Sequence, residues 1–205
     1  AAGGLVGASP ELLVARSGPQ VRASAVAGTL PRAGPAADAR AAARLLGSAK
    51  EQAEHAVVVD AVRAALKGIC DPLHVAAEPS VLWMRTVLHL ATDVRGVLRR
   101  PDLGALDLAA RLHPTPAVCG APTDVALGLI RELEPIDRAL YAGMVGWTDA
   151  RGDGQWAVAL RCAEVQGRIA LLFAGAGIVA ASDPEAELVE TDAKLSSMLD
   201  ALGCA

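Results

Sequence analysis

Three strand-like runs joined by short turns near the end of the chain limit the possible folds more than any other feature. Residues 143–148, 155–163 and 168–173 are rich in apolar and β-branched residues, and the turn-like stretches DARGDG and EVQG separate them. Connections this short join antiparallel strands, because a parallel crossover needs a dozen or more residues. The three runs therefore predict an antiparallel meander.

Strand runs and helix runs are segregated along the rest of the chain. Residues 4–9 predict a strand, residues 11–16 and 21–26 a hairpin, and residues 27–36 a loop rich in glycine and proline. Residues 75–98 have a mixed character that leans towards strand. Apolar spacing predicts helices at 37–69 (broken near Gly47), 103–112, 124–132 and 183–202. This order predicts one α+β domain over residues 1–205, an antiparallel sheet with flanking helices.

The composition excludes several classes of protein. Aromatic residues make up only 2% of the chain, so small aliphatic side chains must build the core, and Trp83, Trp147 and Trp156 are predicted in the core or an interface. A net charge of −4 without a basic stripe argues against nucleic acid as a partner. No apolar run is long enough to cross a membrane. The four cysteines lack metal-site spacing and predict reduced thiols in the cytoplasm.

Residues 175–180, GAGIVA, fit the dinucleotide-binding pattern G-x-G-x-x-G/A. That pattern binds a pyrophosphate only where its glycines open a helix. Here the helix signals come later, because Ser182 and Glu185 have capping-box spacing and Pro184 suits a first turn. A nucleotide loop is therefore disfavoured. The glycines either expose N–H groups to a carboxylate or form a tight exit from a strand.

Two acidic pairs occur at helical spacing. Glu51 and Glu54 are three residues apart, as are Glu187 and Glu190, so each pair shares a helix face. Acidic residues are favoured at helix starts by the helix dipole, which is one explanation. Carboxylate ligands for Mg²⁺ are the other. Spacing alone does not show whether the two pairs meet, and both explanations stay open.

Eight segments together resemble the chorismate-utilising enzymes, a family that includes isochorismate, salicylate and anthranilate synthases. They occur in the family's order and cover nearly the whole chain. The segments are GASPELLV (7–14), AGT (27–29), SAKEQAEH (48–55), LHLAT (88–92), HPTPAVCGAP (113–122), ELEPIDRALYAGMVGW (132–147), VALRCA (158–163) and LFAGAGIVAASDPEAELVET (172–191). The resemblance implies an α/β sandwich like anthranilate synthase component I, built from two similar halves. This chain is expected to supply the C-terminal portion.

The resemblance also implies roles in a reaction on chorismate. Glu11 matches the general acid that protonates the departing C4 hydroxyl, which requires a raised pKa. Arg161 matches the partner of the enolpyruvyl carboxylate, to which a guanidinium can bind through two hydrogen bonds. The other substrate positions implied are Gly28, Thr29, His89, Ala117, Val118, Tyr141, Leu160, Phe173, Gly175, Gly177 and Lys194.

The implied cofactor is Mg²⁺, which would hold the ring carboxylate of chorismate. Glu54 and Glu190 match the carboxylates that bind the ion. Glu51 and Glu187 are implied to lie nearby and to act through water. The acidic pairs thus gain a function through the resemblance that their spacing does not establish.

The apolar pair Ala117-Val118 resembles isochorismate synthases, especially those of siderophore pathways. Salicylate synthases tend to carry a threonine there, and anthranilate-type enzymes have a lysine where this chain has Thr123. The implied activity is that of an isomerase that adds water at C2 of chorismate and removes the C4 hydroxyl. Salicylate synthase is one alternative.

A catalytically silent fragment that binds only Mg²⁺ and substrate is the other alternative. The lysine base of the family belongs to the N-terminal half, which this chain is expected to lack. None of Lys50, Lys67 and Lys194 lies in that motif. We expect the missing half to be needed to complete the fold, and the full-length protein to be a monomer.

Overall fold

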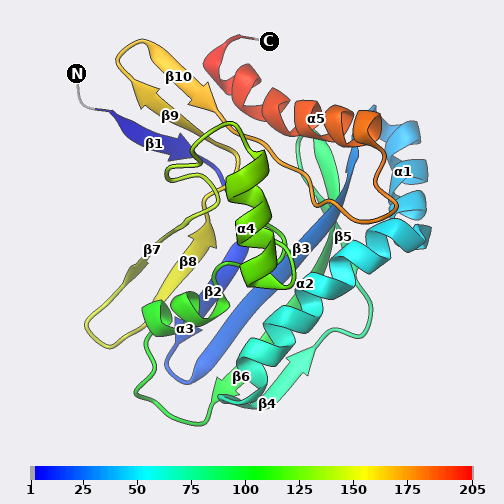
Figure 1. Ribbon diagram of the computed structural model, residues 1–205. Helices are drawn as coiled ribbons and strands as arrows, with labels where there is room; N and C mark the ends of the chain where they lie inside the picture. The colour runs from blue at the N-terminus through cyan, green and yellow to red at the C-terminus, as the bar shows by residue number, and fades with distance from the viewer. Residues whose placement is uncertain (1–2, 205) are drawn as a thin grey trace.

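The computed structural model of the protein describes residues 3–204, which form two antiparallel sheets and five helices (Figure 1). The strands are β1 (Gly4–Gly7), β2 (Leu12–Ser17), β3 (Gln20–Pro31), β4 (Cys70–Val75), β5 (Ser80–Trp83), β6 (Val87–Leu98), β7 (Met144–Thr148), β8 (Gly154–Val158), β9 (Cys162–Gln166) and β10 (Ile169–Leu172). The helices are α1 (Pro35–Gly47), α2 (Ala49–Lys67), α3 (Ala105–Leu112), α4 (Thr123–Leu133) and α5 (Pro184–Leu202).

The larger sheet has seven strands in the order β4-β6-β3-β2-β8-β7, with β5 paired to β6. The smaller sheet has the order β1-β9-β10. Figure 1 shows α2 crossing the large sheet diagonally over β3 and β6, with α3 and α4 on the same side. The predicted α+β class, an antiparallel sheet with flanking helices, is therefore confirmed. Among the described helices, none combines the length and the apolar composition that a membrane crossing would need.

The main core lies between α2 and the large sheet. Val21, Ala23 and Ala25 alternate along β3 and are at most 1% exposed, and Val58 and Leu66 of α2 belong to the same cluster. Alternation places these strand residues on one face of the sheet, and the alanines leave room for the helix. The predicted core of small aliphatic side chains is confirmed.

The tryptophans are only partly where the sequence places them. Trp156 packs against the main core. Trp83 and Trp147 are 51% and 59% exposed, so a core position is wrong for both. Each lies on a short strand, β5 or β7, that pairs with one strand among the described residues. A side chain at such a margin has no second neighbouring strand to cover it.

The predicted meander is wrong at one join. The expected strand 155–163 ends at Val158 and resumes at Cys162, where the chain passes from the large sheet to the small one. β8 pairs with β2 and β9 pairs with β1, so β8 and β9 are not neighbours. Arg161 lies in this break with a left-handed φ of 49°. The apolar pattern continues through the break, which is why periodicity did not reveal it.

Residues 27–31 form strand rather than the predicted loop, because β3 continues to Pro31. Its pairing with β6 shifts register between Ala27 and Thr29, and Gly28 has a φ of 77°. A glycine at a bulge adopts this conformation without steric strain. By contrast, the predicted break near Gly47 is confirmed, since α1 ends there and α2 begins at Ala49.

The last helix begins one residue later than its predicted cap. Asp183, not Ser182, caps α5, and its carboxylate accepts a hydrogen bond from the backbone N–H of Ala186 at 2.9 Å. The Ser182 hydroxyl instead accepts from the backbone N–H of Val179 at 3.1 Å. The helix still starts well after the glycines, so the argument against a nucleotide loop holds.

The position of Leu66 in the main core predicts a large stability effect. Leu66→Ala is expected to lower the free energy of unfolding by about 2–5 kcal/mol, because the side chain is fully buried and would leave a cavity. Leu133→Ala is the matched control, since this leucine is 71% exposed, and its effect should stay within about 0.5 kcal/mol. Urea denaturation measures both. Equal losses would contradict the placement of the core.

Candidate active site

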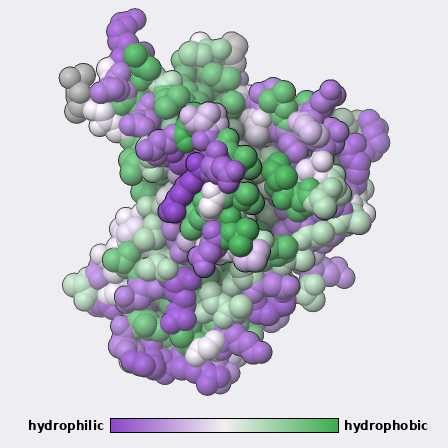
Figure 2. Space-filling model, in the orientation of Figure 1, coloured by the Kyte–Doolittle hydropathy of each residue, from purple (hydrophilic) through white to green (hydrophobic). Residues whose placement is uncertain are grey.

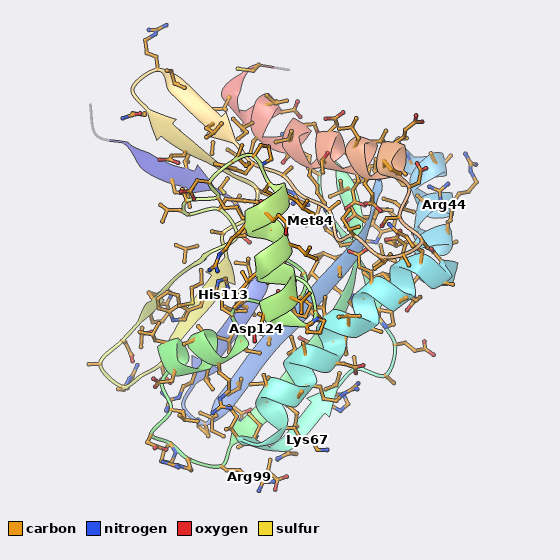
Figure 3. The ribbon with its side chains drawn as sticks, in the orientation of Figure 1. Arg44, Lys67, Met84, Arg99, His113 and Asp124 are labelled. Carbon is orange, nitrogen blue, oxygen red and sulfur yellow. The ribbon has the colours of Figure 1, made fainter. Side chains whose placement is uncertain are left out.

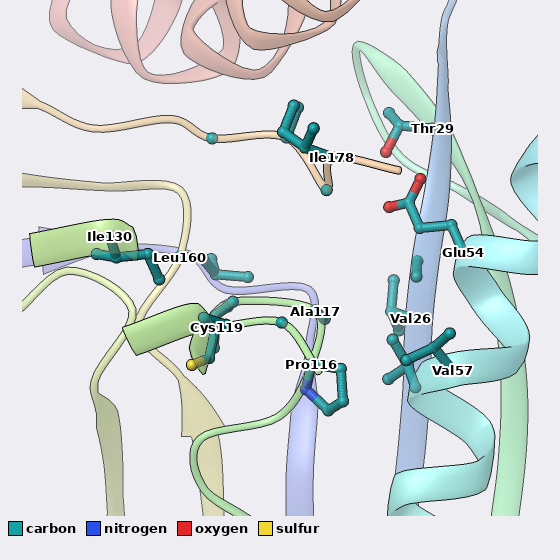
Figure 4. A pocket seen from close by; sticks show the side chains of 18 of the residues that line it. Val26, Thr29, Glu54, Val57, Pro116, Ala117, Cys119, Ile130, Leu160 and Ile178 are labelled. Atoms are coloured by element: carbon teal, nitrogen blue, oxygen red, sulfur yellow. The ribbon is translucent and has the colours of Figure 1, made fainter. Parts of the chain in front are cut away.

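A cavity of about 560 Å³ opens between β3 and α2 on one side and the turn 116–121 and α4 on the other. Figure 4 shows Glu54 and Thr29 on one wall, with Ala117 and Cys119 across the space and Ile178 above it. Its volume is within the range of small-molecule sites. Val125, Leu129 and Leu133 of α4 are exposed, and Figure 2 shows apolar surface in the region where α4 lies.

The cavity collects most of the residues predicted from the sequence. Phe173 is the exception among the predicted substrate positions, because it lies outside the lining. Of the four predicted metal ligands, Glu54 lines the cavity. The predicted acid and substrate residues that line it are Glu11, Gly28, Thr29, His89, Ala117, Val118, Tyr141, Leu160, Arg161, Gly175, Gly177 and Lys194.

Arg161 reaches the cavity because of the break between β8 and β9. Its Nη2 atom lies 3.0 Å from Nε2 of His89. Because a guanidinium can only donate, that ring nitrogen must accept the hydrogen bond. Burial, aided by the charges of Arg161 and Lys194, lowers the pKa of His89 to about 3. The ring is therefore neutral and carries its proton on Nδ1, which lies 3.0 Å from the Thr29 hydroxyl. With this tautomer the hydroxyl accepts the bond, so its own proton is not used on the ring.

Glu11 stands immediately before β2, and its side chain is only 3% exposed. Its carbonyl accepts from the backbone N–H of Val158, which ties it to β8 beside the break. Burial raises the pKa of Glu11 to about 8, against the opposing effect of the positive charges of Arg161 and Lys194. The carboxyl group is thus largely protonated near neutral pH, as a general acid must be.

The buried stripe of α2 changes from apolar to polar towards the start of the helix. Glu51 lies on this stripe, and the Thr29 backbone N–H donates to its Oε2 at 3.0 Å. The other carboxylate oxygen lies 3.2 Å from Lys50 Nζ. Lys50 also donates to Glu187 at the start of α5, at 2.8 Å. The structure therefore brings the two acidic pairs together, which spacing left open.

Glu54 and Glu190 form the part of this acidic group nearest the cavity. Burial, followed by the negative charges of Glu190 and Glu51, raises the pKa of Glu54 to about 7. Lys194 Nζ lies 2.5 Å from Glu190 and 2.8 Å from the Gly175 carbonyl oxygen.

The glycine segment 175–180 lies directly against this acidic group. A Cβ at Gly177 would come within 2.4 Å of Glu54 Oε1, closer than any real contact. The backbone can approach the carboxylate only because this residue has no side chain. Gly177 therefore allows a close approach to an acidic side chain, and the helix that follows is not opened by the glycines.

The donor set is compatible with Mg²⁺. Within residues 3–204, no three acidic, histidine or cysteine side chains are close enough to form a ready-made metal cluster. Mg²⁺ does not need such a cluster, because it commonly takes one or two carboxylates and completes its shell with water and substrate oxygens. Glu54 and Glu190 could supply these two. Both are held among buried charges rather than on an exposed surface.

The opposite wall is apolar and is held partly by Arg138, a residue whose role the sequence did not indicate. Arg138 donates to the Val118 carbonyl at 2.7 Å and forms an ion pair with Glu134. Tyr141 stacks on Phe173 with ring centroids 5.2 Å apart, so Phe173 supports the wall from behind. Arg138 lies in one of the segments that resemble the family, but nothing in its spacing distinguishes it from a surface arginine.

The comparison with known proteins decides the family. A family model described as chorismate binding enzyme matches residues 3–203. The chain belongs to the chorismate-binding enzyme family. It is 54% identical over 200 residues to isochorismate synthase DhbC of Bacillus subtilis (strain 168), an alignment that covers 97% of this chain and 50% of that protein.

Solved structures of the family agree with the fold. The crystal structure of the Bacillus anthracis protein assigned as a 2,3-dihydroxybenzoate-specific isochorismate synthase, DhbC, matches with a TM-score of 0.96 and 52% identity, over 98% of this chain and 54% of that one. Anthranilate synthase component I from Streptococcus pneumoniae TIGR4 matches with a TM-score of 0.80 and 36% identity, over 95% of this chain and 43% of that one.

The predicted family and the predicted fold are both confirmed by these relatives. The chain spans about half the length of the curated relatives it matches.

The raised pKa of Glu11 predicts a pH-dependent contribution to stability. The ordinary value is 4.5 and the folded value about 8, so the folded protein binds this proton more tightly than the unfolded chain. The contribution is therefore complete below about pH 4.5 and is lost as the pH rises towards 8. The amide in Glu11→Gln cannot ionise, so this variant should lose less free energy of unfolding over this range than the wild type. The difference is up to about 1.4 kcal/mol for each pH unit.

Chemical denaturation at about pH 5 and about pH 8 measures this difference. Glu132→Gln is the matched control, because Glu132 is exposed on α4 and should follow the wild type. If Glu11→Gln shows the same pH dependence as the wild type, the buried carboxyl is not protonated as we infer.

Proposed function

We propose that this chain supplies the chorismate-binding and Mg²⁺-binding part of an isochorismate synthase. The observation that carries the proposal is a protonated carboxyl, Glu11, in the same cavity as a half-buried guanidinium, Arg161. An acid beside an anion receptor suits a substrate with carboxylates and a hydroxyl leaving group. Chorismate has these groups. Family membership and the names of the relatives support the same substrate.

Arg161 is proposed to bind the enolpyruvyl carboxylate. Its guanidinium is half-buried and oriented by neutral His89, so the arginine keeps its whole charge for a ligand. The Thr29 hydroxyl proton is available to a second oxygen of the substrate. The backbone at Gly177 can come close because this residue has no side chain.

Mg²⁺ bound by Glu54 and Glu190 would supply positive charge for the ring carboxylate. We propose that Glu51 and Glu187 lie one shell further out and act through water. In support, the Glu51 oxygens already bind Thr29 and Lys50. A cation would favour the ionised form of Glu54, whose pKa is raised by burial and by two neighbouring carboxylates.

The proposed reaction adds a water oxygen to C2, with its proton going to a base, while the ring double bond shifts and the C4–O bond breaks. Glu11 donates its proton to the departing hydroxyl, which leaves as water. Deprotonated Glu11 is then next to Arg161 and Lys194, whose charges stabilise the carboxylate. We assign the base to the part of the full-length protein outside this chain.

The rest of the protein is also expected to cover apolar surface. α4 has no buried residue although it lines the cavity, and Ile169 and Leu171 of β10 are 74% and 55% exposed. We propose that the remaining half packs here and that the full-length protein is a monomer. A cytoplasmic location stays part of the proposal, and the four free cysteines of residues 3–204 agree with it.

Glu190→Gln is expected to abolish the Mg²⁺ dependence of chorismate binding, because it removes one of the two proposed ligand carboxylates. Isothermal titration of chorismate into the chain, with Mg²⁺ and with a chelator, measures this. Glu132→Gln, on an exposed position, should behave as the wild type. Retained binding with unchanged metal dependence would remove Glu190 from the proposed site.

The product of the complete protein tests the reaction. The chain joined to the first half of Bacillus subtilis DhbC should convert chorismate with Mg²⁺ to isochorismate, and Glu11→Gln should reduce the rate by about 100-fold or more. Chromatography separates the products. Salicylate with pyruvate would instead identify a salicylate synthase, and chorismate binding without any product would favour the silent-fragment alternative.

A further inference from the structure

Lys50 joins the starts of the two helices that carry the acidic pairs. Its ammonium group donates to Glu187 at 2.8 Å and lies 3.2 Å from Glu51, two glutamates that are only 7% and 6% exposed. Lys50 and Glu187 are 137 residues apart in the sequence. The contact therefore exists only because α2 and α5 bring their first turns together.

The charges around this contact do not balance. Four carboxylates face two lysine ammonium groups, and the Arg161 guanidinium also acts on Glu190, so carboxylates still outnumber cations in this largely buried place. Burying unpaired charge is unfavourable, so an arrangement of this kind favours a bound cation. The groups are Glu51, Glu54, Glu187, Glu190, Lys50 and Lys194.

The two lysines occupy different positions. Lys194 lines the cavity and also bonds the Gly175 carbonyl, so it is part of the substrate site. Lys50 does not line the cavity, and neither do its two partners, Glu51 and Glu187. Within residues 3–204, Glu54, which lines the cavity, has no lysine within ion-pair distance. Lys50 thus neutralises the outer carboxylates and leaves an inner one for a metal ion.

We propose that Lys50 is a positioning residue of the metal site, a built-in cation that holds Glu51 and Glu187 and thereby restricts Mg²⁺ to Glu54 and Glu190. This inference rests on the Mg²⁺ site of the proposed function. Lys50 and Mg²⁺ then stabilise the same acidic group by charge. Loss of Lys50 should make the metal-free chain less stable and should strengthen the binding of Mg²⁺.

A simpler alternative is that Lys50 only connects α2 to α5. A connecting ion pair would be lost in the variant whether or not Mg²⁺ is present. A charge-balancing lysine can be replaced by the metal ion. The two hypotheses therefore differ in whether Mg²⁺ restores the stability of a variant without the lysine.

The test compares Lys50→Met and Lys50→Arg with Lys67→Met as the matched control. Lys67 is exposed at the opposite end of α2, as Figure 3 shows. Isothermal titration gives the affinity for Mg²⁺, and thermal unfolding is followed in Mg²⁺ and in a chelator. Lys50→Met should bind Mg²⁺ about tenfold more tightly, because a positive charge near the ion is removed, and should gain a larger rise in Tm from Mg²⁺ than the wild type.

Lys50→Arg, which keeps the charge, and Lys67→Met should both match the wild type. The inference is overturned if Lys50→Met has an unchanged Mg²⁺ affinity, or loses the same Tm with and without Mg²⁺. It is also overturned if the variant is unfolded and Mg²⁺ does not restore folding. If neither calorimetry nor the Tm of the wild-type chain responds to Mg²⁺, the metal site itself is overturned. The three variants would then show no response to Mg²⁺ either.

Discussion

The confinement of four carboxylates to one largely buried place is the constraint on which the rest of the site depends. Such a group is unstable unless cations and N–H donors surround it. The structure meets this need from three elements, through Lys50 of α2, Lys194 of α5 and the backbone N–H of Thr29 on β3. The crossing of α2 over β3 and the docking of α5 thus become parts of one electrostatic arrangement.

The same physical cause acts in opposite directions on the two titratable groups of the substrate site. Burial favours the neutral form of any group, so it raises the pKa of Glu11 to about 8 and lowers that of His89 to about 3. One becomes a proton donor near neutral pH. The other becomes a fixed hydrogen-bonding link between Arg161 and Thr29. Both results need the apolar surroundings that the aliphatic core supplies.

The cavity also depends on parts of the fold that bury little. α4 forms part of its wall although none of its residues is buried, and Arg138 donates a hydrogen bond to the turn before it. The relatives of this chain are about twice as long. If the remaining half of the protein covers the α4 wall, we expect that wall to be exposed in this chain, next to the hydrogen-bonded polar side of the cavity.

Sequence and tertiary structure contributed different things. The periodicity, the low aromatic content and the segregation of strands from helices were sufficient for the α+β class, the break near Gly47 and the aliphatic core, because these follow from local pattern. The segments that resemble the family indicated Glu11, Arg161 and Glu54, and the structure places all three around one cavity.

Local pattern could not reveal where the chain changes sheet. The break at Arg161 is set by pairing with β1 and β2, which are far away in the sequence. Nor could spacing show that the acidic pairs meet through Lys50, since a contact across 137 residues exists only after α2 and α5 have packed. The sequence by itself determined the elements and the chemical groups. The tertiary structure decided which charges are buried together, and therefore which of them can bind a metal ion or hold a proton.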